Sequence, residues 1–133
     1  MQLGYTVGCC LRCIYCWPNW SMDFPEKFGK PYSHKAVTLR LFKATEEGIV
    51  YSRYWRNSIP KVNKLRLSGY EPTLGKEHLL AFLRFVKESK YSLFILETNG
   101  MILGFDNNYV KRLAKFKEKL YVRVSFKAVT RRI

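Results

Sequence analysis

Apolar residues recur along the chain with the two periods that mark strands and helices. The stretch 62–68 alternates so that Leu65 and Leu67 point to one side, as in a half-buried strand. The stretch 93–96 is apolar throughout, which predicts a strand buried on both faces. Together the pattern predicts strands over 2–7, 62–68, 93–96 and 120–126.

Three other segments place apolar residues three and four positions apart, which predicts helices. Ser33 can cap the first of them. The stretch 17–32 is rich in proline and predicts a loop, and 51–60 is not assigned. The predicted helices cover 34–47, 76–89 and 109–117.

Strands that alternate with helices predict a parallel sheet with right-handed crossovers. With 133 residues, the chain is long enough for one domain with its own core. We therefore expect an α/β fold, a partial (βα) barrel of about four βα units, in a single domain over residues 1–133.

Residues of unusual chemistry follow each predicted strand. Cys9 follows the first strand, residues 68–72 follow the second and 97–100 follow the third. Ser125 and Lys127 close the fourth strand. The carboxyl ends of parallel strands share one rim, where such sheets bind ligands. The sequence therefore predicts a ligand site at this rim.

All four cysteines lie within residues 9–16, as Cys9, Cys10, Cys13 and Cys16. A disulfide framework would spread cysteines along the chain, so this cluster indicates a metal site in a reducing compartment. Four thiolates can hold zinc, but no second cysteine pair or nearby histidine completes a zinc spacing. Adjacent residues at a strand end point in different directions, so we expect Cys10 to face away from the ligands.

The spacing Cys9-x3-Cys13-x2-Cys16 resembles the signature of the radical S-adenosylmethionine (radical SAM) superfamily. The residue before the last cysteine is aromatic, which fits the same signature. Residues 68–74 look like that family's Gly-Gly-Glu-Pro stretch, and 97–100 and 124–127 look like its third and fourth strand ends. Within the superfamily the chain is most similar to activating-enzyme-like members.

The resemblance implies a [4Fe–4S] cluster on Cys9, Cys13 and Cys16, whose fourth iron binds S-adenosylmethionine. In the family, an electron from the cluster cleaves that cofactor to methionine and a 5′-deoxyadenosyl radical, and a flavodoxin or ferredoxin would supply the electron. By resemblance the backbone after the second strand lies beside the methionine amino group, the third strand end contacts the ribose and Lys127 meets the carboxylate. The implied cofactor-binding residues are Gly69, Tyr70, Glu71, Pro72, Thr98, Asn99, Ser125 and Lys127.

Two features depart from the family pattern. Tyr70 stands where a second glycine is usual. Family barrels commonly have six strands, whereas this chain reaches about four, so we expect a radical SAM core that is incomplete on its C-terminal side. Whether the chain is itself an active enzyme stays open. The alternative is a truncated, non-catalytic remnant that binds only cluster or cofactor, and a second chain could complete the barrel.

The net charge is +14, with 24 basic and 10 acidic residues. Such a surface would attract an acidic protein or RNA, which keeps a zinc-dependent nucleic-acid-binding module as a third interpretation. Solvated helix faces are the simpler explanation of the charge. No apolar run approaches the ~20 residues of a membrane span. With no basic, apolar leader at the N-terminus, we expect a cytoplasmic protein with no membrane partner.

Overall fold

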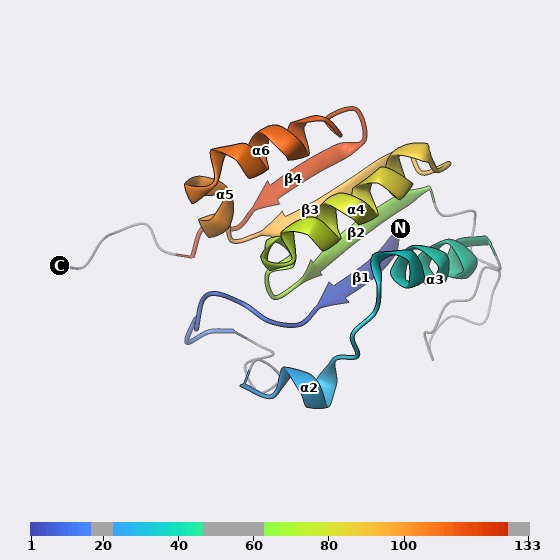
Figure 1. Ribbon diagram of the computed structural model, residues 1–133. Helices are drawn as coiled ribbons and strands as arrows, with labels where there is room; N and C mark the ends of the chain where they lie inside the picture. Colours follow the sequence, from blue (N-terminus) through green and yellow to red (C-terminus); the bar gives the residue numbers. More distant parts are fainter. Residues whose placement is uncertain (17–22, 47–62, 128–133) are drawn as a thin grey trace.

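The computed structural model describes residues 1–16, 23–46 and 63–127. Four parallel strands form one sheet in the order β1-β2-β3-β4, with their arrowheads pointing the same way (Figure 1). The strands are β1 (Gln2–Thr6), β2 (Lys64–Gly69), β3 (Leu93–Thr98) and β4 (Leu120–Val124). The helices are α2 (Pro25–Phe28), α3 (His34–Glu46), α4 (Lys76–Glu88), α5 (Met101–Phe105) and α6 (Asn107–Ala114), with a 3-10 turn η1 (Pro72–Leu74).

Each strand pairs in parallel with the next one along the chain. This succession confirms the expected α/β fold, which is consistent with a partial (βα) barrel. The four predicted strands are all present, and the boundaries move by a few residues. The unassigned stretch 51–60 and the tryptophans Trp17, Trp20 and Trp55 lie outside the described residues.

The core lies between the sheet and the helices that cover one of its faces. Helices α3, α4 and α6 lie on this face (Figure 1). Leu65 and Leu96 of the sheet are buried against α4 and α6, which contribute Leu83 and Tyr109 to the same cluster. Because α4 repeats its apolar residues every three to four positions, one side of it is buried along its length.

The prediction that β3 is buried on both faces is wrong. Phe94 and Leu96 are buried, whereas Leu93 and Ile95 are only half-buried. Burial therefore alternates from residue to residue along β3, although every residue of the run is apolar. None of the described helices covers the second face of the sheet, where Tyr5 and Tyr121 are 65% and 58% exposed. We call this second face the open face.

Side-chain caps explain where α3 and α6 begin. The Ser33 hydroxyl accepts a hydrogen bond from the Ala36 amide, which confirms the predicted cap of α3. Helix α6 begins two residues before the predicted position because Asp106 accepts from the Tyr109 amide and caps it. Helices α2 and α5 were not expected, and α2 lies within the predicted loop 17–32.

Histidines join α3 to α4. The rings of His34 and His78 meet edge to face with centroids 5.9 Å apart, and His34 also stacks on Phe85. This contact fixes the start of α3 against α4. Within the part of the chain that the structure describes, no helix has the length and hydropathy of a membrane span.

Candidate site at the carboxyl rim of the sheet

The loop after β1 carries all four cysteines, and it lies against the ends of the other three strands. Its first anchor is on the β2 side. The Gly8 carbonyl accepts a hydrogen bond from the Glu71 amide at 3.0 Å, and the Thr6 carbonyl accepts from the Tyr70 amide at 3.5 Å. These bonds continue the pairing of β1 with β2 beyond the sheet, so the chain enters the cysteine segment at a fixed position on the rim.

The second anchor is at the end of β3, where Asn99 meets two sulfur atoms. Its side-chain nitrogen lies 3.8 Å from the Cys9 sulfur and 3.4 Å from the Cys10 sulfur. The expectation that these adjacent side chains point in different directions is therefore wrong, because both thiols reach the same amide. That only Cys9 of the two binds the cluster stays a prediction. The residue at position 9 already belongs to a loop, so the alternation of a strand does not extend to it.

Opposing effects act on the pKa of the Cys9 thiol. Burial raises the pKa of its thiol, while a hydrogen bond from the Leu11 amide to the sulfur lowers it. The nearby Cys10 and Glu71 also raise this pKa, and the Asn99 amide lowers it. Together these effects leave the pKa of the Cys9 thiol above its ordinary value. The hydrogen bonds from Leu11 and Asn99 are the contacts that would stabilise a thiolate here.

The third anchor is at the end of β4. The Cys16 amide donates to the Cys13 carbonyl at 3.0 Å, which forms a turn with Tyr15 inside it. The Tyr15 hydroxyl donates to the main-chain oxygen of Lys127 at 2.7 Å. Desolvation, together with the Cys13 and Cys16 thiols beside the phenol, raises the pKa of Tyr15 above its ordinary value.

The donor set of this loop fits an iron–sulfur cluster. All four thiols are free, and Cys9, Cys13 and Cys16 are partly exposed. Thiolates are the ligands that such clusters use. Within residues 1–16, 23–46 and 63–127, no three histidine, cysteine, aspartate or glutamate side chains lie close enough together to hold a metal ion. The chain therefore brings the three cysteines to one loop on the rim without closing them into a finished metal site.

Glu71 is the buried centre of the rim. Its side chain is only 2% exposed. One carboxyl oxygen accepts from the Thr73 amide and hydroxyl and from the Thr98 hydroxyl, and the other accepts from the Asn99 amide at 2.7 Å. Because these four donors already surround the carboxyl group, Glu71 joins the turn after β2 to the end of β3. Any effect of Glu71 on a cofactor acts through the backbone that it holds.

The other residues of the turn after β2 fit the expectation that its backbone, rather than its side chains, faces the cofactor. Gly69 has a φ of 104°, and a Cβ atom there would lie 2.6 Å from the Thr6 carbonyl oxygen. Only glycine allows this approach. Tyr70 is half-buried, and Pro72 is buried in the first position of η1. The turn thus accommodates a tyrosine where the family usually has glycine.

The remaining predicted residues divide into buried and exposed ones. Thr98 is buried and accepts from the Gly100 amide at 3.0 Å, besides donating to Glu71. The Ser125 amide donates to the Thr98 carbonyl at 2.8 Å, which holds the end of β4 against β3. Ser125 and Lys127 are exposed. The structure therefore brings all eleven predicted site residues to one rim, with Ser125 and Lys127 open to solvent.

A charged cluster on the open face was missed from the sequence. Glu97 accepts from Arg66 at 2.7 Å, from Ser68, and from Arg123 at 3.1 Å. Burial acts to raise the pKa of Glu97, but the bonds from Arg66 and Ser68 and the charge of Arg123 outweigh it, so this pKa lies below its ordinary value. Alternation could have placed these residues on one face, but the register that brings them together is not visible in the sequence.

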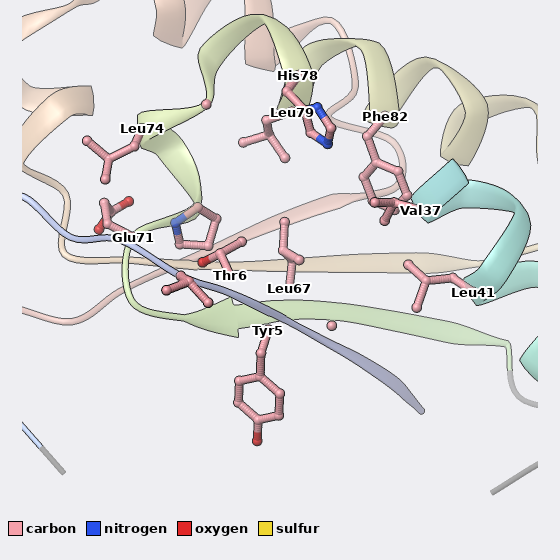
Figure 2. Close-up of a pocket in the computed structure, with 14 residues that line it drawn as sticks. Tyr5, Thr6, Val37, Leu41, Leu67, Glu71, Leu74, His78, Leu79 and Phe82 are labelled. Atoms are coloured by element: carbon pink, nitrogen blue, oxygen red, sulfur yellow. The ribbon is translucent and has the colours of Figure 1, made fainter. Parts of the chain in front are cut away.

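A cavity of about 250 Å³ lies on the helix-covered face, beside the rim. Val37 and Leu41 of α3 and Leu79 of α4 line it, and Glu71 and His78 are among its polar lining residues. In Figure 2, Tyr5 points away from these apolar side chains, toward the open face. The lining is mainly apolar. Because Glu71 and Pro72 of the turn after β2 line it together with α3 and α4, the cavity adjoins the rim.

The parallel sheet with a three-cysteine loop at its carboxyl rim agrees with the resemblance to the radical SAM superfamily, and the curated relatives to which the chain is similar support that resemblance. These relatives are GTP 3′,8-cyclases, which are radical SAM enzymes. The enzyme of Nautilia profundicola is 32% identical over 115 residues, which cover 85% of this chain and 30% of the relative. That of Campylobacter jejuni is 28% identical over 104 residues, or 77% of this chain and 28% of the relative.

The chain thus spans about 30% of the length of the curated relatives that it matches. Neither a protein-family model nor a solved structure matches it. The relatives confirm the resemblance to the superfamily. The finer resemblance to activating enzymes stays a prediction, since these relatives carry a different name.

Proposed function

We propose that this chain holds a [4Fe–4S] cluster on Cys9, Cys13 and Cys16 and binds S-adenosylmethionine at the adjoining rim. One observation supports this most strongly. The segment that carries the cysteines is hydrogen-bonded to the ends of β2, β3 and β4, through Gly8, Cys9 and Tyr15. A cluster on this loop would therefore lie beside every residue that the sequence assigns to the cofactor.

The role that we propose for each rim residue follows from whether its side chain is buried or exposed. The buried Glu71 and Thr98 hold the strand ends in place, and the backbone after Gly69 is left to face the methionine part of the cofactor. Lys127 is exposed at the end of β4, where its ammonium group can make a charge-assisted bond to the carboxylate. Ser125 is exposed two residues before it.

The cluster, when bound, would supply the electron that cleaves S-adenosylmethionine reductively. The protein contributes the position of the ligands and the exclusion of water. The rim is closed on the side of the helices by the buried Glu71 network, whereas the open face carries exposed tyrosines. We therefore propose that cleavage requires further strands that cover this face.

A partner chain or additional residues of the same protein could supply those strands. β1 and β4 are the edges of the described sheet. β4 presents Val122 toward the helices and the exposed Tyr121 toward the open face. An exposed edge of this kind favours pairing with another strand, and closure into a barrel removes the edge.

An acidic electron-transfer protein such as a flavodoxin or ferredoxin is the proposed donor. The chain has a net charge of +14, which favours association with an acidic surface. Some basic side chains are already paired, such as Lys76 with Asp106 and Arg112 with Glu77. RNA is the competing polyanion, and a salt-dependent binding comparison of the two would separate them.

The relatives' name gives the substrate to test first. They are GTP cyclases by name, so GTP is the first nucleotide to offer to this chain. The open face carries two arginines, Arg66 and Arg123. Guanidinium groups bind phosphate oxygens well, although here both are engaged by Glu97.

The test is anaerobic reconstitution followed by addition of S-adenosylmethionine and dithionite, with chromatographic detection of 5′-deoxyadenosine. Iron and sulfide in the protein, with product formation, support a radical SAM enzyme. Iron and sulfide without product, in the chain alone and with candidate partners, support the remnant that only binds. Zinc without sulfide contradicts the proposal and supports the nucleic-acid-binding alternative.

A further inference from the structure

The side-chain amide of Asn99 has one orientation in the hydrogen-bond network. Its oxygen accepts from the Met101 amide at 2.9 Å. A backbone N–H can only donate, so the oxygen must face Met101. The side-chain nitrogen is thereby directed at the cysteines, 3.8 Å from the Cys9 sulfur and 3.4 Å from the Cys10 sulfur.

Asn99 is itself held in place from the opposite side. Its backbone amide donates to Glu71 at 2.7 Å, and the residue is only 9% exposed. Gly100 follows in the left-handed region with a φ of 81°, and a Cβ atom there would lie 2.8 Å from Val124. The side chain therefore cannot leave the sulfurs without breaking either its bond to Met101 or the turn after β3.

A chain of contacts thus runs from the buried carboxyl group of Glu71, through Asn99, to Cys9. We propose that Asn99 is a positioning residue for the cluster, which donates an N–H···S hydrogen bond to its first cysteine ligand while Glu71 fixes the donor. This inference rests on the proposed function. Hydrogen bonds to the sulfurs are among the features that set the reduction potential of such clusters.

The direction of the effect follows from charge. Reduction adds an electron to the cluster and its thiolates, and an N–H donor stabilises the added negative charge. Loss of the donor therefore disfavours reduction. We expect about a tenfold change in the reduction equilibrium, which corresponds to ~59 mV for one electron.

The experiment compares the midpoint potential of the reconstituted cluster by EPR-monitored redox titration. Asn99→Ala removes the donor without adding charge or a new donor, and Asn99→Asp removes it while keeping an oxygen for Met101. We expect Asn99→Ala to lower the midpoint potential by ~59 mV, a tenfold change in the reduction equilibrium, and Asn99→Asp to lower it further. Asn107→Asp makes the same change at an exposed position in α6 and should leave the potential unchanged.

Circular dichroism of the same samples shows whether each variant is folded. A folded Asn99→Ala variant with a full cluster and the parent's potential overturns the role of Asn99 and leaves the proposed function standing. If Asn99→Ala does not fold, the folded Asn99→Asp variant decides by the same criterion. A parent chain that takes up no [4Fe–4S] cluster contradicts the proposed function, and the role of Asn99 falls with it.

Discussion

The Tyr15 hydroxyl donates a hydrogen bond to the main-chain oxygen of Lys127 across 2.7 Å, although 112 residues separate them in the sequence. This bond connects the turn between Cys13 and Cys16 to the residue that follows the last strand. The cysteine loop therefore reaches from its origin at β1 across the rim to β4. The proposed cluster ligands and the proposed contact for the cofactor carboxylate are thus joined directly by the protein chain.

Tyr15→Phe removes this connection without changing the size of the ring. We expect amides of residues 11–16 to exchange with deuterium severalfold faster in the variant, because the loop keeps its anchors at β2 and β3 only. Exchange in β2 and β3 should not change. Tyr5→Phe, on the open face, is the control, and equal exchange in both variants would show that the Tyr15 bond does not hold the loop.

Gly69→Ala should destabilise the fold. The positive φ of Gly69 is unfavourable for alanine, and the added Cβ would lie 2.6 Å from the Thr6 carbonyl oxygen. A strained residue of this kind costs about 1–3 kcal/mol. Urea denaturation measures the free energy of unfolding.

Gly104→Ala is the matched control for that substitution. No atom lies within 4 Å of a Cβ placed at Gly104, and the residue is within α5. Alanine in a helix is favoured over glycine by up to about 1 kcal/mol, so this variant should be as stable as the parent or more so. Equal losses in the two variants would contradict the close approach at Gly69.

Glu71→Ala should be among the most destabilising single changes on the rim. It leaves the hydroxyls of Thr73 and Thr98 and the Asn99 amide without their acceptor in a buried position. Unsatisfied buried donors of this kind cost about 1–3 kcal/mol each. Thermal and urea unfolding measure the loss, and Glu118→Ala, an exposed glutamate, should cause almost none. A similar stability for both variants would contradict the buried network.

The lowered pKa of Glu97 predicts that the folded protein loses stability in acid. Its pKa is lower in the folded state than its ordinary value, so the unfolded state binds more protons as the pH falls. The stability from Glu97 is complete above the unfolded value of about 4.3 and is lost as the pH falls through the lower, folded pKa. Urea denaturation of the parent and of Glu97→Gln, at neutral pH and in acid, isolates this contribution. The difference between the two proteins should shrink in acid, and a constant difference would contradict the role of Arg66 and Arg123.

Much of the fold could be predicted from the sequence, because alternation in β2 and helical spacing in α4 depend on burial against a single neighbouring layer. The rim could also be predicted, since parallel strands bring their carboxyl ends together. The two-sided burial of β3 could not be judged correctly, because an apolar run does not reveal whether a second layer covers it. Ile95 shows this, as it lies half-buried on the open face.

Details of the site depended on contacts between distant segments. The direction of Cys10 follows from a bond to Asn99, 89 residues away, and no local pattern encodes it. The Glu97 cluster likewise needs the register of three strands. By contrast, the sequence did place Glu71 at the rim, although its complete burial became visible only when Thr98 and Asn99 were seen around it.

The most direct test of the account is the iron and sulfide content of the anaerobically reconstituted chain, together with its EPR spectrum after reduction. We predict about four irons per chain in the parent and in Cys10→Ser, and loss of the cluster in each of Cys9→Ala, Cys13→Ala and Cys16→Ala. A full [4Fe–4S] spectrum in any of those three variants would contradict the assignment of that ligand. Loss of the cluster in Cys10→Ser would show that Cys10 is a cluster ligand and would point to the spacing Cys10-x2-Cys13-x2-Cys16 instead. A parent chain without iron would contradict the cluster altogether.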